Sequence, residues 1–286
     1  MRIFTILIGL SVIVSSAMAW GFVHAQGNNK ISPADMLKME TSDTDPYWKN
    51  AQKEVYKSVP QLVAQDQEET KNNKMPKKLM RGPLNRKEIA ITFDDGPHPQ
   101  FTPKILDILR KNRDKATFFL VGMMAEKYPE LVKAEVKDGH SVGNHTYHHV
   151  SLPKIPAEYV AVEIQACTDV LKNAGVKSPH LFRPPGGDYT TKIARIANNL
   201  GYTLILWTDD PGDYNSPGTK IIINRLLGRL DNGGIILIHD GVQETVDALP
   251  DLLKAIRERG FTTVTIDDYL KHKGGNTVPS PVRLHL

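Results

Sequence analysis

Cysteine is almost absent from this sequence. Cys167 is the single cysteine among 286 residues, which excludes any internal disulfide bond. A chain of this length can bury a sufficient core without disulfides, so the scarcity does not argue against export from the cell. Residues 160–167 have the pattern of an amphipathic helix. This setting favours a small buried core residue at Cys167 over a nucleophile.

A strong excess of charge of either sign is also lacking. The formal net charge is +4, from 36 basic and 32 acidic side chains. The chain has none of the interleaved aromatic and basic motifs of the common nucleic-acid-binding modules, so we expect no nucleic-acid partner. No Walker motif or glycine-rich dinucleotide motif follows any apolar segment, which weakens a nucleotide-binding function.

A long apolar run occurs at the N-terminus. Arg2 precedes the apolar residues 3–14, and residues 17–19 (Ala-Met-Ala) form the A-x-A pattern of a signal-peptide cleavage site. Residues 23–25 form a second such site, and the apolar character continues far enough to span a bilayer as an uncleaved anchor. We therefore expect residues 1–25 to be a signal peptide or an N-terminal membrane anchor, with the cleaved signal preferred, and the protein to act outside the cytoplasm.

Apolar residues become sparse after the N-terminal run. Residues 26–82 are rich in Asn, Gln, Lys, Asp and Glu, with one short helical pattern over 47–63, and residues 71–87 contain several basic residues but no acidic one. A solvated linker is the ordinary interpretation. Attraction to an anionic wall polymer or membrane surface is the alternative. We expect a polar extension over 26–82, a catalytic domain over 83–272 and a C-terminal tail over 273–286.

Short apolar segments alternate with longer amphipathic ones from Glu88 onward. The predicted strands are 89–93, 116–121, 141–144, 180–183, 203–207, 234–239 and 262–266. This alternation predicts a parallel sheet with helices outside it. The continuous apolar character of residues 235–238 fits a strand buried on both faces. The pattern leaves an open doubly wound sheet and a barrel as alternatives.

Polar residues gather directly after five of these strands. The five clusters are 94–95, 145–149, 183–188, 208–214 and 239–240. In barrels and in open parallel sheets, the C-terminal edge of the strands is where active sites are built. Five polar clusters at one edge therefore predict a single functional site.

The spacing of the histidines and aspartates suggests a metal ion. His145 and His149 are four residues apart, so on one helical turn they could share a metal. Asp94 and Asp95 point to opposite sides of an extended strand, so one can bind a metal while the other faces a reacting water. Two histidines and one carboxylate form a hydrolytic zinc site, but the same ligands suit non-haem iron oxygenases. Two alternative interpretations without a metal remain: the histidines could lie on the surface without a ligand, and the Asp-Gly-Pro residues could form an ordinary turn.

Three further residues at this edge need an explanation. His239 ends an apolar strand, where a core histidine is common, but its position beside the other clusters favours a catalytic acid. Arg183 and Asp213 need partners if they are buried, because an unpaired buried charge is costly. Pairing Arg183 with Asp94, and Asp213 with His239, would meet that need and tune two pKa values.

Together these clusters resemble the motifs of the polysaccharide deacetylases with a NodB homology domain, carbohydrate esterase family four. The family motifs TFDDGP, H-[ST]-x-x-H, R-P-P-x-G, D-x-x-D-W and L-x-H correspond, in the family's order, to residues 92–97, 145–149, 183–187, 210–214 and 237–239. The resemblance covers roughly residues 84–270. It implies an α/β fold, an irregular (β/α) barrel of about seven strands in a single catalytic domain.

The resemblance also implies a role for each motif residue. Asp94 corresponds to the catalytic base and His239 to the catalytic acid, and the residues that orient them are Arg183 and Asp213. The implied ligands of one divalent metal ion are Asp95, His145 and His149. Zn²⁺ is the expected ion, with Co²⁺ or another divalent ion as the alternative. The implied substrate-binding residues are Pro184, Gly186, Tyr214 and Leu237.

Two positions depart from the family pattern. Gly186 stands where the family usually has an aromatic residue; glycine retains the backbone N–H that helps to bind the oxyanion but has no side chain to contact the substrate. Tyr214 stands where the family usually has tryptophan, and its smaller ring and polar tip would reshape the wall beside the acetyl pocket. Both departures concern substrate preference rather than reaction type.

The implied reaction is removal of N-acetyl groups from a polysaccharide, with release of acetate. Peptidoglycan or a chitin-like GlcNAc polymer is the expected substrate, and peptidoglycan is preferred because an exported enzyme with a basic stretch would meet the cell wall first. One alternative is an esterase that removes O-acetyl groups from a xylan-like polymer. Another is a catalytically silent wall-binding protein. Membrane contact is expected only through an uncleaved N-terminal anchor.

Overall fold

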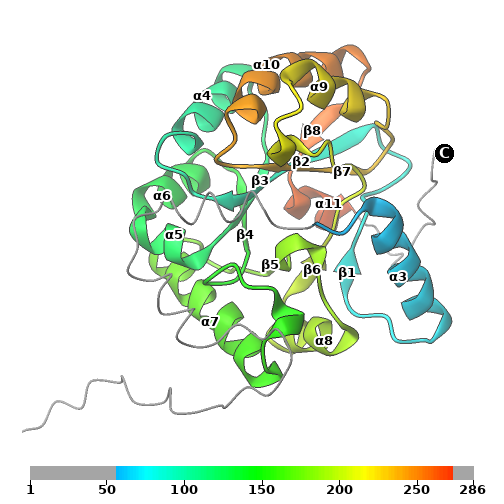
Figure 1. Ribbon diagram of the computed structural model, residues 1–286. Helices are drawn as coiled ribbons and strands as arrows, with labels where there is room; N and C mark the ends of the chain where they lie inside the picture. Colours follow the sequence, from blue (N-terminus) through cyan, green and yellow to red (C-terminus); the bar gives the residue numbers. More distant parts are fainter. Residues whose placement is uncertain (1–55, 273–286) are drawn as a thin grey trace, which may run out of the picture.

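The computed structural model describes residues 56–272 of the chain (Figure 1). The predicted signal peptide or anchor over residues 1–25 and the tail over 273–286 lie outside the described residues, as does the first part of the polar extension. Within the described part, no helix is both long enough and apolar enough to cross a bilayer.

Parallel strands form a single sheet in the described residues. The strands are β1 (Lys78–Leu79), β2 (Glu88–Gly96), β3 (Thr117–Leu120), β4 (Ser141–Asn144), β5 (Leu181–Phe182), β6 (Thr203–Ile205), β7 (Gly234–His239) and β8 (Thr262–Val264). Their order is β1-β6-β5-β4-β3-β2-β7, and β8 pairs with β2. The seven predicted strands are all present, with ends that shift by a few residues, and β1 is an additional strand.

Strand β2 lies at the centre of the arrangement and is buried along its whole length. One of its edges pairs with β7, and the other pairs first with β8 and then with β3. Residues 89, 91 and 93 of β2 pack in the apolar cluster under the outer helices, whereas Ala90 belongs to the cluster inside the barrel. In the register of β2 with β7, Asp94 is the partner of His239. The two proposed catalytic residues therefore end neighbouring strands.

The sheet curls into an irregular barrel, as the resemblance to the polysaccharide deacetylases implies and as the strand pattern alone left open. The segment after β6 approaches β7, where Asp209 and Ile236 form an isolated parallel bridge. The Thr208 N–H donates to the Ile235 carbonyl at 3.0 Å, and the Leu237 N–H donates to the Asp209 carbonyl at 2.8 Å. These bonds join the segment after β6 to β7 by a short bridge rather than a full strand.

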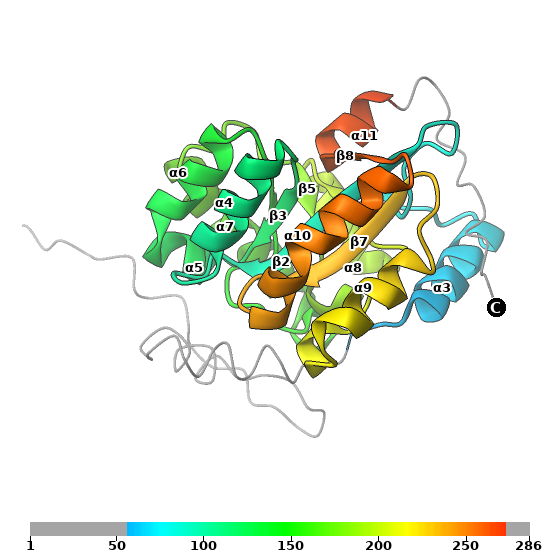
Figure 2. The same ribbon diagram turned by 90° about the horizontal axis from the view of Figure 1, so that it is seen from above.

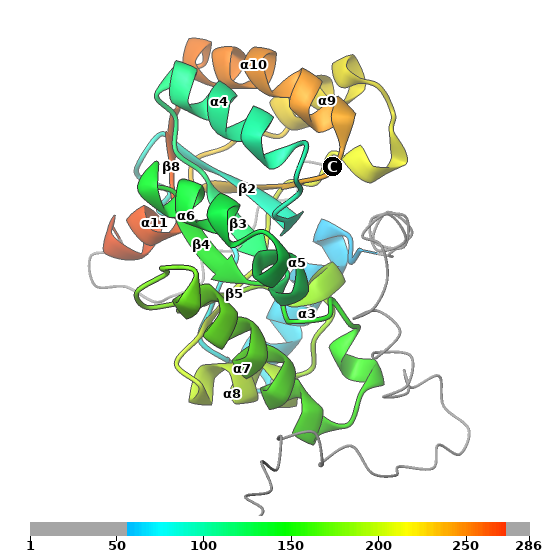
Figure 3. The same cartoon turned by 90° about the vertical axis from the view of Figure 1, so that its left-hand side faces the viewer.

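Helices surround the strands on the outside (Figures 2 and 3). The α-helices are α3 (Val59–Lys71), α4 (Thr102–Asn112), α5 (Gly122–Lys127), α6 (Pro129–Lys137), α7 (Ala157–Asn173), α8 (Thr191–Asn199), α9 (Thr219–Leu227), α10 (Gln243–Glu258) and α11 (Ile266–His272). Helix α10 lies between α4 and α9 on one side, and α7 and α8 cover the opposite side. Cys167 is buried on α7, as predicted.

Residues 56–82 do not form the solvated linker that we expect from their composition. The helix predicted over 47–63 instead begins at Val59 and ends at Lys71, and the residues before 56 lie outside the described part. The Ser58 N–H donates to the Gln61 side chain at 2.8 Å, in a capping arrangement that starts the helix. Leu62 and Val63 are buried in the inner core, and β1 pairs with β6. This segment is therefore part of the folded unit.

The polar composition of this segment hides its packing. The Lys78 side chain is 3% exposed, and its Nζ atom lies 2.8 Å from Asp66 and also contacts Glu69. Buried charges of opposite sign that pair with each other are tolerated in a folded interior. A count of charged residues cannot distinguish buried ion pairs from solvated charges. This explains why a solvated linker was the wrong interpretation for residues 56–82.

Candidate metal and catalytic site

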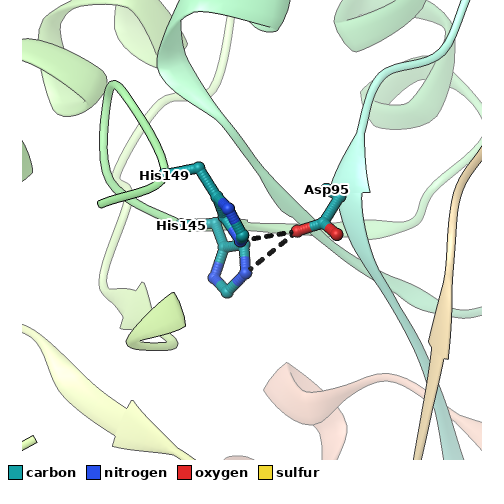
Figure 4. Close-up of side chains that lie close together, drawn as sticks. All are labelled: Asp95, His145 and His149. Carbon is teal, nitrogen blue, oxygen red and sulfur yellow. Dashed lines mark ion pairs between the residues drawn. The ribbon is translucent and has the colours of Figure 1, made fainter. Parts of the chain in front are cut away.

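A cluster of three potential metal ligands lies at the C-terminal edge of the sheet. Asp95 comes from the end of β2, and His145 and His149 come from the loop after β4 (Figure 4). The Asp95 Oδ1 atom lies 2.9 Å from His149 Nε2 and 3.3 Å from His145 Nε2. The three ligand atoms lie within 4.8 Å of one another, and all three residues are buried. The structure thus brings together the three predicted ligands.

The two histidines do not share a helical turn, so that part of the prediction is wrong. Residues 145–149 form an irregular loop in which Thr146 and His149 have φ angles of 68° and 57°. The left-handed conformation is unfavourable for these residue types and persists only where the surroundings hold it. The Asn144 side chain accepts a bond from the Thr146 N–H at 2.9 Å, and Thr146 Oγ1 accepts one from the His149 N–H at 3.1 Å. These bonds stabilise the turn that brings His149 back toward His145.

The adjacent His148 points away from this cluster. Its Nδ1 atom lies 2.7 Å from Glu163 Oε1, and the other oxygen of Glu163 accepts bonds from the N–H groups of Tyr147 and His148. Glu163 lies on α7, so this carboxylate ties the loop to a helix. His148 is therefore not one of the three clustered ligands.

The donor atoms of the cluster fit a divalent cation. The His145 Nδ1 atom lies 2.7 Å from the Arg183 carbonyl, and donation to that oxygen leaves the Nε2 lone pair directed at Asp95. His145 Nε2 and Asp95 Oδ1 are buried and make no hydrogen bond within the described residues. Burial alone would raise the pKa of Asp95, but His149 and His145 hold this pKa well below its usual value. Two imidazoles and an ionised carboxylate are a donor set typical of zinc.

Asp94 is held by a buried arginine, as predicted. The Arg183 Nη1 atom donates to Asp94 Oδ1 at 2.6 Å and to Thr92 Oγ1 at 2.7 Å. The guanidinium is fully buried, with its central carbon 4.1 Å from the centre of the Phe119 ring. Asp94 Oδ2 is buried without a hydrogen bond in the described part of the chain and lies 3.7 Å from His145 Nε2. One oxygen of this carboxylate is therefore fixed and the other faces the metal cluster.

His239 forms the second predicted pair. Its Nδ1 atom lies 2.7 Å from Asp213 Oδ1, and its backbone N–H donates to Asp213 Oδ2 at 2.8 Å. Thr245 Oγ1 donates to the same Oδ2 at 2.6 Å. Burial alone would lower the pKa of His239, but the Asp213 carboxylate, with smaller effects from Asp95 and Asp94, raises it to about 9. An imidazole in this setting carries a proton at neutral pH.

The sequence and the fold of this chain are similar to those of known proteins. The sequence profile described as "Polysaccharide deacetylase" matches residues 81–205. A peptidoglycan-N-acetylglucosamine deacetylase from Bacillus cereus is 39% identical over 196 residues, which span 67% of this chain and 92% of that protein. The chain belongs to the polysaccharide deacetylase family.

Other members of the polysaccharide deacetylase family are comparably similar. A chitooligosaccharide deacetylase from Azorhizobium caulinodans is 35% identical over 192 residues, which span 62% of this chain and 91% of that protein. A crystal structure of a peptidoglycan N-acetylglucosamine deacetylase in complex with a substituted N-hydroxybenzamide superposes with a TM-score of 0.66. It is 35% identical and covers 68% of this chain and 92% of its own. The predicted family and its irregular barrel are thereby confirmed.

The predicted substrate-binding residues of this family member lie in different settings. The Tyr214 ring stacks on the His239 ring, with 3.8 Å between centroids, and the Tyr214 hydroxyl donates to Asp95 Oδ2. Pro184 and Gly186 lie in the turn after β5, where Gly186 has a φ of 61° that suits glycine. Leu237 is fully buried on β7. The structure thus places Tyr214 directly against both the acid candidate and a metal ligand.

Two aromatic residues near this deacetylase site are not predicted from the sequence. The Tyr56 ring centroid lies 4.8 Å from that of His239, and its hydroxyl donates to Asp95 Oδ2 at 3.3 Å. The Trp207 ring lies 6.4 Å from the Tyr56 ring and is fully buried. Tyr56 is missed because it precedes the family motifs, in a stretch that resembles a linker. In the sequence it lies inside the helix predicted over 47–63, where an aromatic residue gives no sign of a role at the site.

Proposed function

We propose that this chain is a metal-dependent hydrolase that removes N-acetyl groups from a GlcNAc-containing polysaccharide and releases acetate. One observation carries the proposal. Asp94 Oδ2 and His239 Nε2 are both buried without a hydrogen bond in the described residues, at the ends of paired strands beside the three metal ligands. A base and an acid supported by separate partners are what amide hydrolysis requires, because an amine leaves readily only after it accepts a proton.

Asp95, His145 and His149 would hold the metal ion, for which we propose Zn²⁺, with Co²⁺ or another divalent ion as the alternative. The bound ion would supply polarisation of the acetyl carbonyl and a lower pKa for the attacking water. Asp94 takes the proton from that water through Oδ2, because Arg183 occupies Oδ1. His239 gives its Nε2 proton to the leaving nitrogen, while Asp213 holds the opposite ring nitrogen.

Further groups of the chain would bind the substrate. The backbone N–H of Gly186 is proposed to donate to the oxyanion, since it lies in the turn directly after Arg183. The Tyr214 ring would form the wall of the acetyl pocket beside His239. Pro184 and Leu237 would complete the pocket. These assignments follow from the match to the family motifs.

Peptidoglycan is the proposed substrate, and a chitin-like polymer is the alternative. The B. cereus relative is named for the first substrate and the A. caulinodans relative for chitooligosaccharides. We propose that the protein acts at the cell wall, outside the cytoplasm, because residues 1–25 have a signal or anchor pattern. It would be either secreted or anchored in the membrane through that segment.

Acetate release from a panel of polymers tests this function. The zinc-loaded protein should release acetate from peptidoglycan or chitooligosaccharides, and mass spectrometry of the product should locate the free amine on the sugar. Faster release from acetylated xylan than from either polymer would establish the esterase alternative. Zinc binding without acetate release from any polymer would instead support a catalytically silent wall-binding protein.

The proton on His239 predicts how activity depends on pH. Because Asp213 raises the pKa of His239 to about 9, kcat/KM should fall as the pH rises through that value. In Asp213→Asn the negative charge is lost while the burial remains, so the pKa of His239 should fall and the alkaline limb should move to lower pH. Profiles of kcat/KM between pH 5 and about 10 measure the position of the alkaline limb in the wild type and in Asp213→Asn. An unmoved limb in Asp213→Asn would exclude His239 as the acid.

A further inference from the structure

Two tyrosine hydroxyls converge on one oxygen of Asp95. The Tyr214 hydroxyl donates to Asp95 Oδ2, and the Tyr56 hydroxyl donates to the same atom at 3.3 Å. The other oxygen, Oδ1, faces the two histidines at 2.9 and 3.3 Å. The two oxygens of this carboxylate therefore have separate surroundings, with phenols on one and imidazoles on the other.

We propose that Tyr56 is a positioning residue of the metal site, which acts with Tyr214 to fix the orientation of the Asp95 carboxylate. Rotation of this carboxylate would carry Oδ2 away from both hydroxyls, so the two bonds oppose it. A ligand whose second oxygen is held in this way presents Oδ1 alone to a cation. Outer partners of this kind typically change metal affinity by about 10–100-fold.

The position of Tyr56 is itself held by the chain that follows it. The Lys57 N–H donates to the Gly186 carbonyl at 2.9 Å, and the Lys57 ammonium lies 3.2 Å from Asp188. Helix α3 starts directly afterwards and packs on the barrel through Leu62. The segment before the family motifs is thus attached to the turn after β5 beside the metal site. This attachment places the Tyr56 hydroxyl where it can reach Asp95.

The Tyr56 ring also has contacts that a hydroxyl deletion would leave in place. It lies 4.8 Å from the His239 ring and 5.9 Å from the Tyr214 ring, measured between centroids. Tyr56→Phe keeps these ring contacts and removes the bond to Asp95. The substitution therefore separates the positioning of the carboxylate from the packing of the aromatic groups.

The test measures metal affinity in the full-length protein. Zn²⁺ binding by competition with a chromophoric chelator should be weaker by at least about tenfold in Tyr56→Phe, and weaker still in the double variant with Tyr214→Phe. The visible spectrum of the Co²⁺-loaded protein should change in the same variants, because the ligand field depends on how Asp95 is oriented. Tyr269→Phe is the matched control. Its hydroxyl donates to the Glu88 carbonyl at 2.8 Å, at the opposite end of β2, so its metal affinity should equal that of the wild type.

This inference rests on the proposed metal site, and the two can fail separately. If the wild type binds Zn²⁺ and Tyr56→Phe binds it equally tightly with an unchanged Co²⁺ spectrum, the positioning role is wrong and the metal site stands. The positioning role is also wrong if Tyr56→Phe raises the rate of acetate release at unchanged affinity, since Tyr56 would then obstruct the substrate. If the wild type binds no divalent metal, both proposals are overturned.

Discussion

Acetate release should fall by about 10²- to 10⁴-fold in Asp94→Asn, the range that general base catalysis contributes. Asparagine has nearly the shape of aspartate and can accept the hydrogen bond from Arg183, but it cannot take a proton from water. The metal should remain bound, because the histidines lie closest to Asp95 rather than Asp94. Acetate assays and metal analysis of the same preparation measure the two effects together.

Loss of the Asp94 charge also leaves the buried Arg183 without its counterion. Breaking a buried ion pair typically costs about 3–5 kcal/mol, so the variant should unfold at a lower urea concentration. Asp240→Asn is the matched control. Asp240 is also buried and follows His239 directly, but it accepts a bond from Thr102, and burial raises its pKa to about 7. This control should retain most of its activity, and an Asp94→Asn variant that also does so would exclude Asp94 as the base.

The sequence predicts the parts of this site that depend on strand ends. Apolar runs mark β2 and β7, and parallel strands in one sheet end at a common edge, so Asp94 and His239 are expected to meet. The same logic predicts that Arg183 and Asp213 pair with them, because charges buried at that edge need partners. Both pairs are present in the structure, at 2.6 and 2.7 Å.

Features that depend on side-chain bonds over long separations are missed. Residue spacing predicts a helical turn for His145 and His149. The loop is instead held by a local bond from the Thr146 N–H to Asn144 and by a bond from the His148 N–H to Glu163, fifteen residues further along the chain. The polar segment before residue 83 packs on the barrel because its charges pair with each other. Tyr56 reaches Asp95 across 39 positions of sequence. Composition and residue spacing describe neither the charge pairs nor the Tyr56–Asp95 bond, because these contacts arise only in the tertiary fold.

Metal binding should be lost in His145→Ala. The variant removes one of three ligands, so its Zn²⁺ affinity should fall by more than the roughly 10–100-fold that is typical of outer-sphere changes. Acetate release should fall with it, and added Zn²⁺ at high concentration should restore part of the activity if the remaining ligands still hold the ion. Isothermal titration calorimetry and metal content after dialysis measure the loss.

His148→Ala is the matched control for this ligand. The two histidines lie three positions apart in one loop, but the His148 imidazole pairs with Glu163 on α7 and points away from Asp95. The control should lose some stability, because Glu163 loses a buried partner, and should keep its full complement of metal. If His148→Ala lost the metal and His145→Ala kept it, the ligand set of Asp95, His145 and His149 would be wrong. Equal loss in both variants would instead show that metal binding also depends on the shape of the loop that Glu163 holds.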